Sequence, residues 1–182
     1  MRVRNRIAWI VLSLLLLVVG VLGVTCRSYL RSLAWHIRNG QYERFGAYRL
    51  KLPMAWWEYG RTWYESPSLL RSHGAHTTGQ INILWIPAER VPREGTDLPK
   101  EEDLLISRFS RDGKAPLMSK YVIKTKSRDL YCIRDGTPPN FSSIRCKGYG
   151  LQYMITYTGD YTTEREAEEI FSTLELSTST TP

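Results

Sequence analysis

Apolar and polar positions divide the chain into an uninterrupted hydrophobic run, an amphipathic stretch and a longer region of alternation. The uninterrupted run, residues 7–24, reads IAWIVLSLLLLVVGVLGV and contains no charged side chain. A helix of this length spans roughly 27 Å, close to the bilayer core of about 30 Å. A cleaved signal peptide is the alternative, but its apolar region is usually shorter, about 7–15 residues. We therefore predict a basic tail at 1–6 and an uncleaved transmembrane anchor at 7–24.

Residues 25–44 carry apolar side chains at helical spacing and predict a juxtamembrane amphipathic helix that stops near Asn39-Gly40. The apolar positions are Tyr29, Leu30, Leu33, Ala34 and Ile37. The basic positions on the same helix are Arg27, Arg31 and Arg38, which we predict to contact lipid head groups. Two placements stay open, because the helix can lie along the membrane or pack on the following domain.

From residue 45 onward the pattern changes to the period of two that is typical of half-buried strands. Tyr48, Leu50 and Leu52 alternate with charged residues up to Pro53, which ends the strand. Further strands are predicted at 58–65, 81–87, 120–126, 128–134, 143–148 and 150–158, and helices at 99–113 and 162–176. This order predicts an α+β domain over 45–176, with an antiparallel sheet flanked by helices, and a polar tail at 177–182.

The two ends of this domain resemble the PsbP-like fold family. At the first end, a strand with Leu52 and Pro53 runs into Trp56 as a Pro-x-x-Trp motif. At the other end, a strand and a polar turn lead into a helix that closes with the apolar segment 171–176. The resemblance implies an α/β/α sandwich and a non-enzymatic accessory domain attached to a larger membrane complex, photosynthetic or respiratory. It carries over no functional residue.

Cys132 and Cys146 flank a Gly-Thr-Pro-Pro-Asn turn that lies almost midway between them. If the flanking segments pair as a hairpin, the two residues lie opposite each other with Cβ atoms about 4.5–5.5 Å apart. This is near disulfide range, and a disulfide implies an oxidising compartment. Two half-buried thiols in a cytosolic sheet are the alternative. We predict a disulfide, a single-pass protein of the cell inner membrane, and a domain on the periplasmic or other extracytoplasmic side.

The net charge of +7 is concentrated around the hydrophobic run. Residues 1–51 hold nine basic side chains and one acidic side chain, whereas residues 52–182 hold sixteen and seventeen. A nucleic-acid-binding protein normally has a basic face on its folded domain, so this distribution argues against that function. It favours attraction to anionic lipids instead.

Candidate catalytic and metal-binding groups are few. His73 and His76 are three residues apart and are the best metal candidates, but no Cys, Asp or Glu nearby supplies a third ligand. The chain lacks the usual nucleophile and phosphate-binding motifs, and the acids at 164–169 are interpreted as a solvated helix face. We therefore predict no catalytic residue, no metal and no cofactor.

Aromatic residues are concentrated between Trp56 and Tyr64. Adjacent residues of a strand point to opposite sides, so we predict that Trp56 is buried and Trp57 lies on a surface. The residues predicted to face a partner or the membrane interface are Trp35, Trp57, Tyr59 and Trp63.

The leading hypothesis is a non-enzymatic, membrane-anchored accessory subunit that contacts lipids through 7–24 and binds other subunits of a membrane complex. One alternative is an envelope metal-dependent hydrolase that uses His73 and His76. Another is a secreted protein that binds a small ligand.

Overall fold

The computed structural model describes residues 2–62, 66–73, 76–98, 118–137 and 141–177. The helices are α1 (Arg2–Thr25), α2 (Arg27–Asn39), the short 3₁₀ helix η2 (Ala88–Arg90) and α4 (Tyr161–Ser172). The first strands are β1 (Tyr42–Phe45), β2 (Tyr48–Lys51), β3 (Trp56–Thr62), β4 (Ser66–His73) and β5 (His76–Trp85). The later strands are β6 (Met118–Ile123), β7 (Leu130–Thr137), β8 (Phe141–Lys147), β9 (Tyr153–Gly159) and β10 (Glu175–Leu176).

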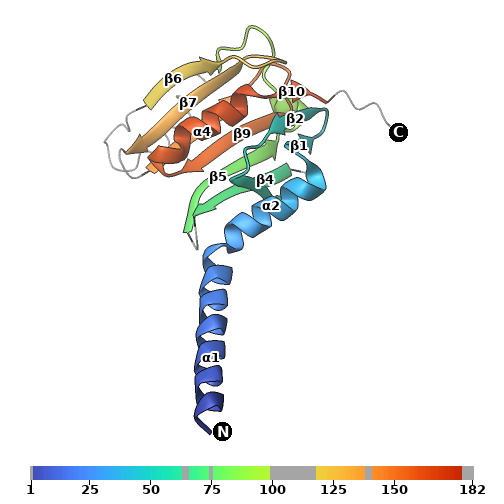
Figure 1. Ribbon diagram of the computed structural model, residues 1–182. Helices are drawn as coiled ribbons and strands as arrows, with labels where there is room; N and C mark the ends of the chain where they lie inside the picture. The colour runs from blue at the N-terminus through green and yellow to red at the C-terminus, as the bar shows by residue number, and fades with distance from the viewer. Residues whose placement is uncertain (1, 63–65, 74–75, 99–117, 138–140, 178–182) are drawn as a thin grey trace.

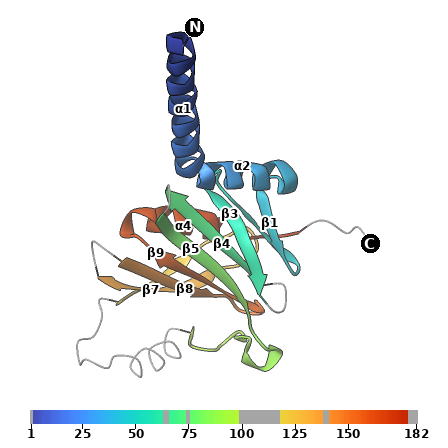
Figure 2. The same cartoon turned by 90° about the horizontal axis from the view of Figure 1, so that it is seen from below.

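The strands form two antiparallel sheets. The larger sheet has the order β3-β4-β5-β9-β8-β7-β6, and the smaller one has the order β1-β2-β10. Helix α4 lies across the larger sheet, and the smaller sheet lies beside it, whereas α1 projects away from the domain (Figure 1, Figure 2). The predicted α+β class with an antiparallel sheet is confirmed. The helix predicted at 99–113 lies outside the described residues.

The main core lies between one face of the larger sheet, α4 and the smaller sheet. Tyr48, Leu50 and Leu52 are all buried in it, which confirms the predicted alternation. Trp56 is fully buried near Tyr157 of β9, with ring centroids 6.5 Å apart. Gly79 of β5 makes room for the indole, since a Cβ there would lie 3.0 Å from Trp56.

Helix α4 packs on this core through the side predicted from its spacing. Ala167, Ile170 and Phe171 are buried, as is Leu174 just after the helix. The preference of helix N-termini for Thr predicts an N-cap at Thr162 or Thr163, and this prediction is wrong, because α4 begins at Tyr161. The preceding Asp160 occupies the N-cap position without a side-chain cap. The Thr163 hydroxyl instead donates to the Thr78 carbonyl oxygen of β5 and so fixes the helix to the sheet.

Three strands differ from the prediction, one of which is β10, because the helix predicted at 162–176 ends at Ser172 and β10 follows it. Strand β1 begins at Tyr42, before the predicted domain start at residue 45. No strand is predicted between 58–65 and 81–87, because Ser66-Pro67 is typical of a break in a strand, yet β4 occupies Ser66–His73. Pro67 lies near the start of β4, where it is in register with Arg61 of β3, and pairing with β5 begins only at Ser68, so the proline is close to the end of the ladder, where a missing N–H is best tolerated.

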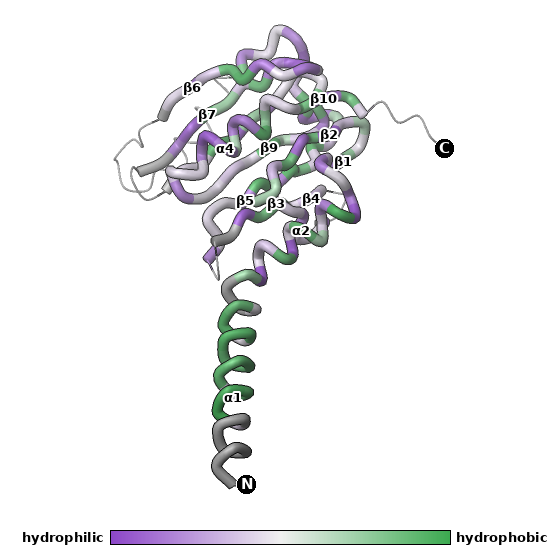
Figure 3. Tube along the Cα trace, viewed as in Figure 1, coloured by the Kyte–Doolittle hydropathy of each residue, from purple (hydrophilic) through white to green (hydrophobic). Residues whose placement is uncertain are grey.

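Between Trp9 and Gly23, helix α1 is exposed, and the hydropathy colouring shows that this part is apolar (Figure 3). Within the described part of the chain, no single helix is long and apolar enough to cross a membrane. The segments Trp9–Gly23 and Arg27–Asn39, bent by 61°, meet that requirement only together, by length and composition.

Candidate membrane-proximal interaction surface

Helix α2 packs on the domain through its polar side. Ser32 and His36 are its buried residues, and the Ser32 hydroxyl donates to the Met54 carbonyl oxygen. His36 Nδ1 lies 2.9 Å from the Gly40 carbonyl oxygen, and its Nε2 lies 3.0 Å from that of Trp56. The imidazole therefore joins the end of α2 to the start of β3. No sequence signal identified this role, because His36 is not part of the apolar stripe.

The apolar stripe of α2 faces outward instead of packing on the domain. Leu30 is 53% exposed and Ile37 is 78% exposed, and Tyr29 and Ala34 are exposed with them. The basic residues Arg27, Arg31 and Arg38 are exposed as well. The helix therefore combines both placements left open by the sequence: one side packs on the domain, and an apolar and basic side is left for a second environment.

A shallow groove of about 950 Å³ lies between α2 and β3. On α2 it is lined by Arg31, Trp35 and Arg38, and on β3 by Trp57, Glu58 and Tyr59. The fold thus brings three of the predicted interface aromatics together with two of the predicted lipid-contacting arginines. Trp63 lies outside the described residues, and we refer to this feature below as the α2–β3 groove.

The predicted surface position of Trp57 is wrong. Trp57 is only 6% exposed, although it points away from Trp56 as expected. Helix α2 runs along the edge of β3, so Trp35 packs against the main core while Arg31 and Arg38 share the groove with Trp57. Tyr59, at 69% exposed, is the aromatic side chain of this group that projects into solvent.

Acidic groups behind the groove are engaged with Arg61 of β3. The Arg61 guanidinium pairs with Glu58 at 2.8 Å and with the buried Glu43 of β1 at 2.5 Å. The pKa of the Glu43 carboxyl is raised to about 7, chiefly by burial and also by the Glu58 carboxylate, while Arg61 acts in the opposite direction. Arg31 and Arg38 have no ion-pair partner within the described ranges.

The raised pKa of Glu43 predicts a loss of stability with rising pH. The folded protein keeps this proton up to about pH 7, whereas the unfolded chain releases it near the ordinary value of 4.5. The stabilisation that comes from the protonated Glu43 carboxyl is complete below about pH 4.5. It is lost as the pH rises through the folded-state pKa of about 7. We expect the free energy of unfolding to fall by up to about 1.4 kcal/mol per pH unit between them. Urea unfolding of the detergent-solubilised protein across this range measures the fall.

The matched variants for this experiment are Glu43→Gln and Glu89→Gln. Glutamine at 43 cannot titrate, so the part of the pH dependence that Glu43 contributes should disappear. Glu89 is exposed on η2, and its replacement should leave the profile unchanged. Equal profiles for all three proteins would contradict the assignment.

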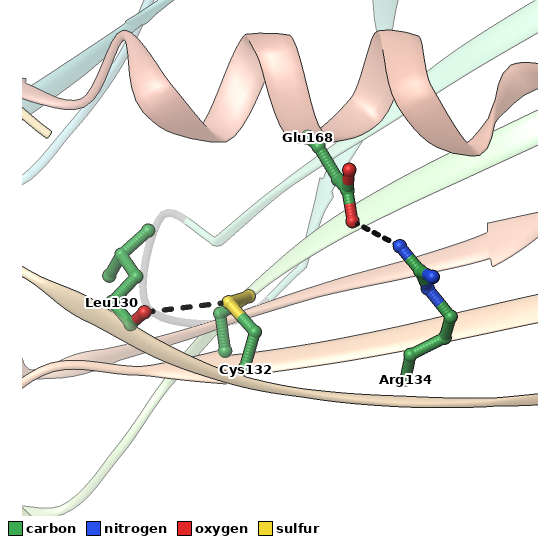
Figure 4. The surroundings of a disulfide bond; sticks show 5 residues. Leu130, Cys132, Arg134 and Glu168 are labelled. Atoms are coloured by element: carbon green, nitrogen blue, oxygen red, sulfur yellow. Dashed lines mark hydrogen bonds and ion pairs between the residues drawn. A yellow bond between two sulfur atoms is a disulfide. The ribbon is translucent and has the colours of Figure 1, made fainter. Parts of the chain in front are cut away.

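The predicted disulfide between Cys132 and Cys146 is confirmed. The residues are register partners on β7 and β8, with Cα atoms 4.2 Å apart, and the bond lies in the core beneath α4 (Figure 4). Cys26, between α1 and α2, is exposed and is not part of the disulfide.

The disulfide closes a loop with a sequence separation of 14 residues. Loop-closure entropy for about 15 residues corresponds to about 3 kcal/mol, so Cys132→Ala with Cys146→Ala should lower the free energy of unfolding by about that amount. Thiol labelling before and after reduction gives a second measurement. The chain has three cysteines, and only Cys26 should react before reduction. Labelling of all three in protein taken directly from cells would contradict an oxidising location.

The two candidate metal-binding histidines lie on neighbouring strands. His73 ends β4 and is the register partner of His76 at the start of β5. Among the described residues, no group of three or more His, Cys, Asp and Glu side chains could hold a metal ion. The hydrolase that uses His73 and His76 stays an untested alternative.

The acids of α4 do not form a uniformly solvated face, so that interpretation is wrong for Glu164. Glu164 is 5% exposed and pairs with Arg134 of β7 at 2.5 Å, while Ser142 of β8 donates a hydrogen bond to it. Arg134 also pairs with Glu168 at 2.8 Å (Figure 4). Burial raises the pKa of the adjacent Tyr121 hydroxyl, and Glu168 raises it further. One arginine thus holds two carboxylates in an arrangement that attaches α4 to the sheet.

No family model and no curated protein matches this chain. The resemblance to the PsbP-like fold therefore stays a prediction, and the function is argued from the geometry alone.

Proposed function

We propose that the protein is a single-span, membrane-anchored accessory subunit whose domain is held at the membrane surface by α2 and binds a neighbouring membrane protein. The observation that carries the proposal is the continuity of exposed apolar surface from α1 onto α2. The described side chains of α1 from Trp9 to Gly23 are all exposed, and Leu30 and Ile37 continue this surface on α2. A helix that is apolar on all sides is stable only inside protein or lipid.

The basic residues of α2 support a position at the head groups. Arg27, Arg31 and Arg38 lie on exposed positions directly after the proposed span. Basic side chains next to a membrane are each stabilised by about 1 kcal/mol near anionic lipids. The disulfide supports an extracytoplasmic domain, since such bonds persist in oxidising compartments.

Tyr59 and the rim of the α2–β3 groove are the proposed contact for the partner. Tyrosine buries a large rigid area on binding and keeps a hydrogen-bonding tip, which suits an interface. Tyr59 is also close to α2, so it reaches a neighbour that is itself embedded in the membrane. The proposal involves no catalytic step.

Co-purification in mild detergent tests this function. The full-length protein, tagged and expressed at its natural level, should remain in the membrane fraction and elute with a second membrane protein. Tyr59→Ala should weaken that association, whereas Tyr29→Ala, an exposed tyrosine on α2 outside the groove lining, should weaken it less. Recovery of the wild type only as a lone monomer contradicts the accessory role.

The secreted ligand-binding alternative has one observation in its favour. An open pocket of about 680 Å³ is lined by Tyr48, Tyr149, Tyr153, Arg93 and Gln152, among others. N-terminal sequencing of the mature protein distinguishes the two proposals, because cleavage after the hydrophobic run would release the domain.

A further inference from the structure

We infer that the α2–β3 groove binds the head group of one anionic phospholipid, with Arg31 and Arg38 as the phosphate ligands. This inference rests on the proposed function, since it requires the domain to lie at a membrane. It goes further than that function because it names one bound lipid for each protein molecule and the two arginines that favour an anionic head group.

The charge of the groove favours an anion. Arg31 and Arg38 lie two helical turns apart on α2 and both line the groove. Its carboxylate, Glu58, is already paired with Arg61 at 2.8 Å. A guanidinium group forms two parallel hydrogen bonds to phosphate oxygens, so a pair of arginines suits a phosphodiester.

The apolar lining favours a lipid over a free phosphate. Ile37 and Ala34 line the groove next to Trp35 and Trp57, and Ile37 is also part of the outward apolar stripe. A phosphate between the arginines would therefore have a continuous apolar path for acyl chains toward α1. The groove lies at the end of the domain where α1 is attached (Figure 2), so the head group and the bilayer are on the same side.

An extended acidic peptide fits this groove less well. Such a peptide normally adds to the free edge of a strand through main-chain hydrogen bonds. Here the edge of β3 is engaged at its start, where the Trp56 carbonyl oxygen lies 3.0 Å from the His36 ring and α2 lies along the strand. A peptide therefore cannot add to this end of the strand, whereas the positive charge of the groove remains available.

Native mass spectrometry of the full-length protein in mild detergent tests the inference. The protein is titrated with phosphatidylglycerol or with phosphatidylcholine that has the same acyl chains. We expect one retained phosphatidylglycerol and at least about tenfold weaker retention of phosphatidylcholine. Arg31→Gln with Arg38→Gln should reduce phosphatidylglycerol retention by about tenfold or more. The matched control is Arg90→Gln with Arg165→Gln, two exposed arginines on η2 and α4 that do not line the groove, and it should retain the lipid as the wild type does.

Three results would overturn the inference. Equal retention of both lipids indicates nonspecific contacts around α1, and equal loss in the control variant indicates a general charge effect. Binding of a glutamate oligopeptide in place of phosphatidylglycerol assigns the groove to an acidic protein segment. Membrane fractionation and co-purification of the same variants separate the two proposals, because a failed lipid site leaves anchoring by α1 and partner recovery intact.

Discussion

Replacing Trp56 with alanine is expected to lower the free energy of unfolding by about 3–5 kcal/mol. The indole is fully buried. It packs against Tyr157 and against Gly79, where the lack of a side chain leaves room for the ring. Its removal leaves a cavity in rigid strands that cannot move far enough to fill it. Urea unfolding of the detergent-solubilised protein, followed by circular dichroism, measures the change without using tryptophan fluorescence.

The controls use the two other aromatic residues of the same strand. Tyr59→Ala should change stability by no more than about 0.5 kcal/mol, because its ring is mostly in solvent. Trp57→Ala should be clearly destabilising, since Trp57 is buried on the other side of β3. If Trp57→Ala left the free energy of unfolding unchanged, this result would contradict the buried position of Trp57 and favour a position on the surface.

The second large effect is expected for Glu164→Ala. The substitution removes one of two carboxylates from Arg134 and leaves the Ser142 hydroxyl without its acceptor. Arg134 keeps Glu168 and is about one third exposed, so we expect a cost of about 1–3 kcal/mol, which is below the roughly 3–5 kcal/mol that is typical when a fully buried charge loses its only partner. Hydrogen exchange should also show that α4 opens more readily than in the wild type, since this cluster attaches the helix to β7 and β8.

Glu169→Ala is the matched control on the same helix. Glu169 forms an exposed pair with Arg165 one turn away, so its loss should cost no more than about 0.5 kcal/mol. If Glu164→Ala proved as mild as this control, the buried cluster would not stabilise the attachment of α4.

Local sequence pattern was sufficient where one physical rule acts over a few residues. The alternation before Pro53 located β2, and the turn between the cysteines set the register that places Cys132 opposite Cys146. Both follow from the two-residue period of a strand. The long hydrophobic stretch likewise predicted a helix at 7–24, but α1 begins earlier, at Arg2, so the basic residues predicted as a tail are part of the helix.

Tertiary packing decided the features that the pattern missed. The apolar stripe of α2 suggested the side that would pack, yet the domain receives Ser32 and His36 because β3 offers backbone carbonyl groups there. In the sequence, Glu164 has the features of an ordinary exposed acid on a helix. It is buried because it pairs with Arg134, which comes from the distant strand β7. Burial of a charged or polar side chain depends on its partner, and no local period reveals that partner.

The sequence identified several residues that line the α2–β3 groove, but it did not predict that they come together. Aromatic enrichment identified Trp57 and Tyr59, and basic spacing identified Arg31 and Arg38. Their convergence depends on α2 turning back along β3, which the sequence left open as one of two placements. The burial of Trp57 follows from the same arrangement.

The pairing of β10 with β2 affects the order in which the molecule can be completed. The last described residues pair with Tyr48 and Arg49, Glu175 forms ion pairs with Arg49 and Lys126, and the Ser177 N–H donates to the Ala47 carbonyl oxygen. During synthesis β2 must therefore wait until Glu175, 126 residues after Arg49, has been made before the smaller sheet is complete. Contacts of such long sequence separation form slowly. A chain cut before residue 175 would leave one edge of β2 unpaired, and that edge would then be the first place for aggregation or proteolysis.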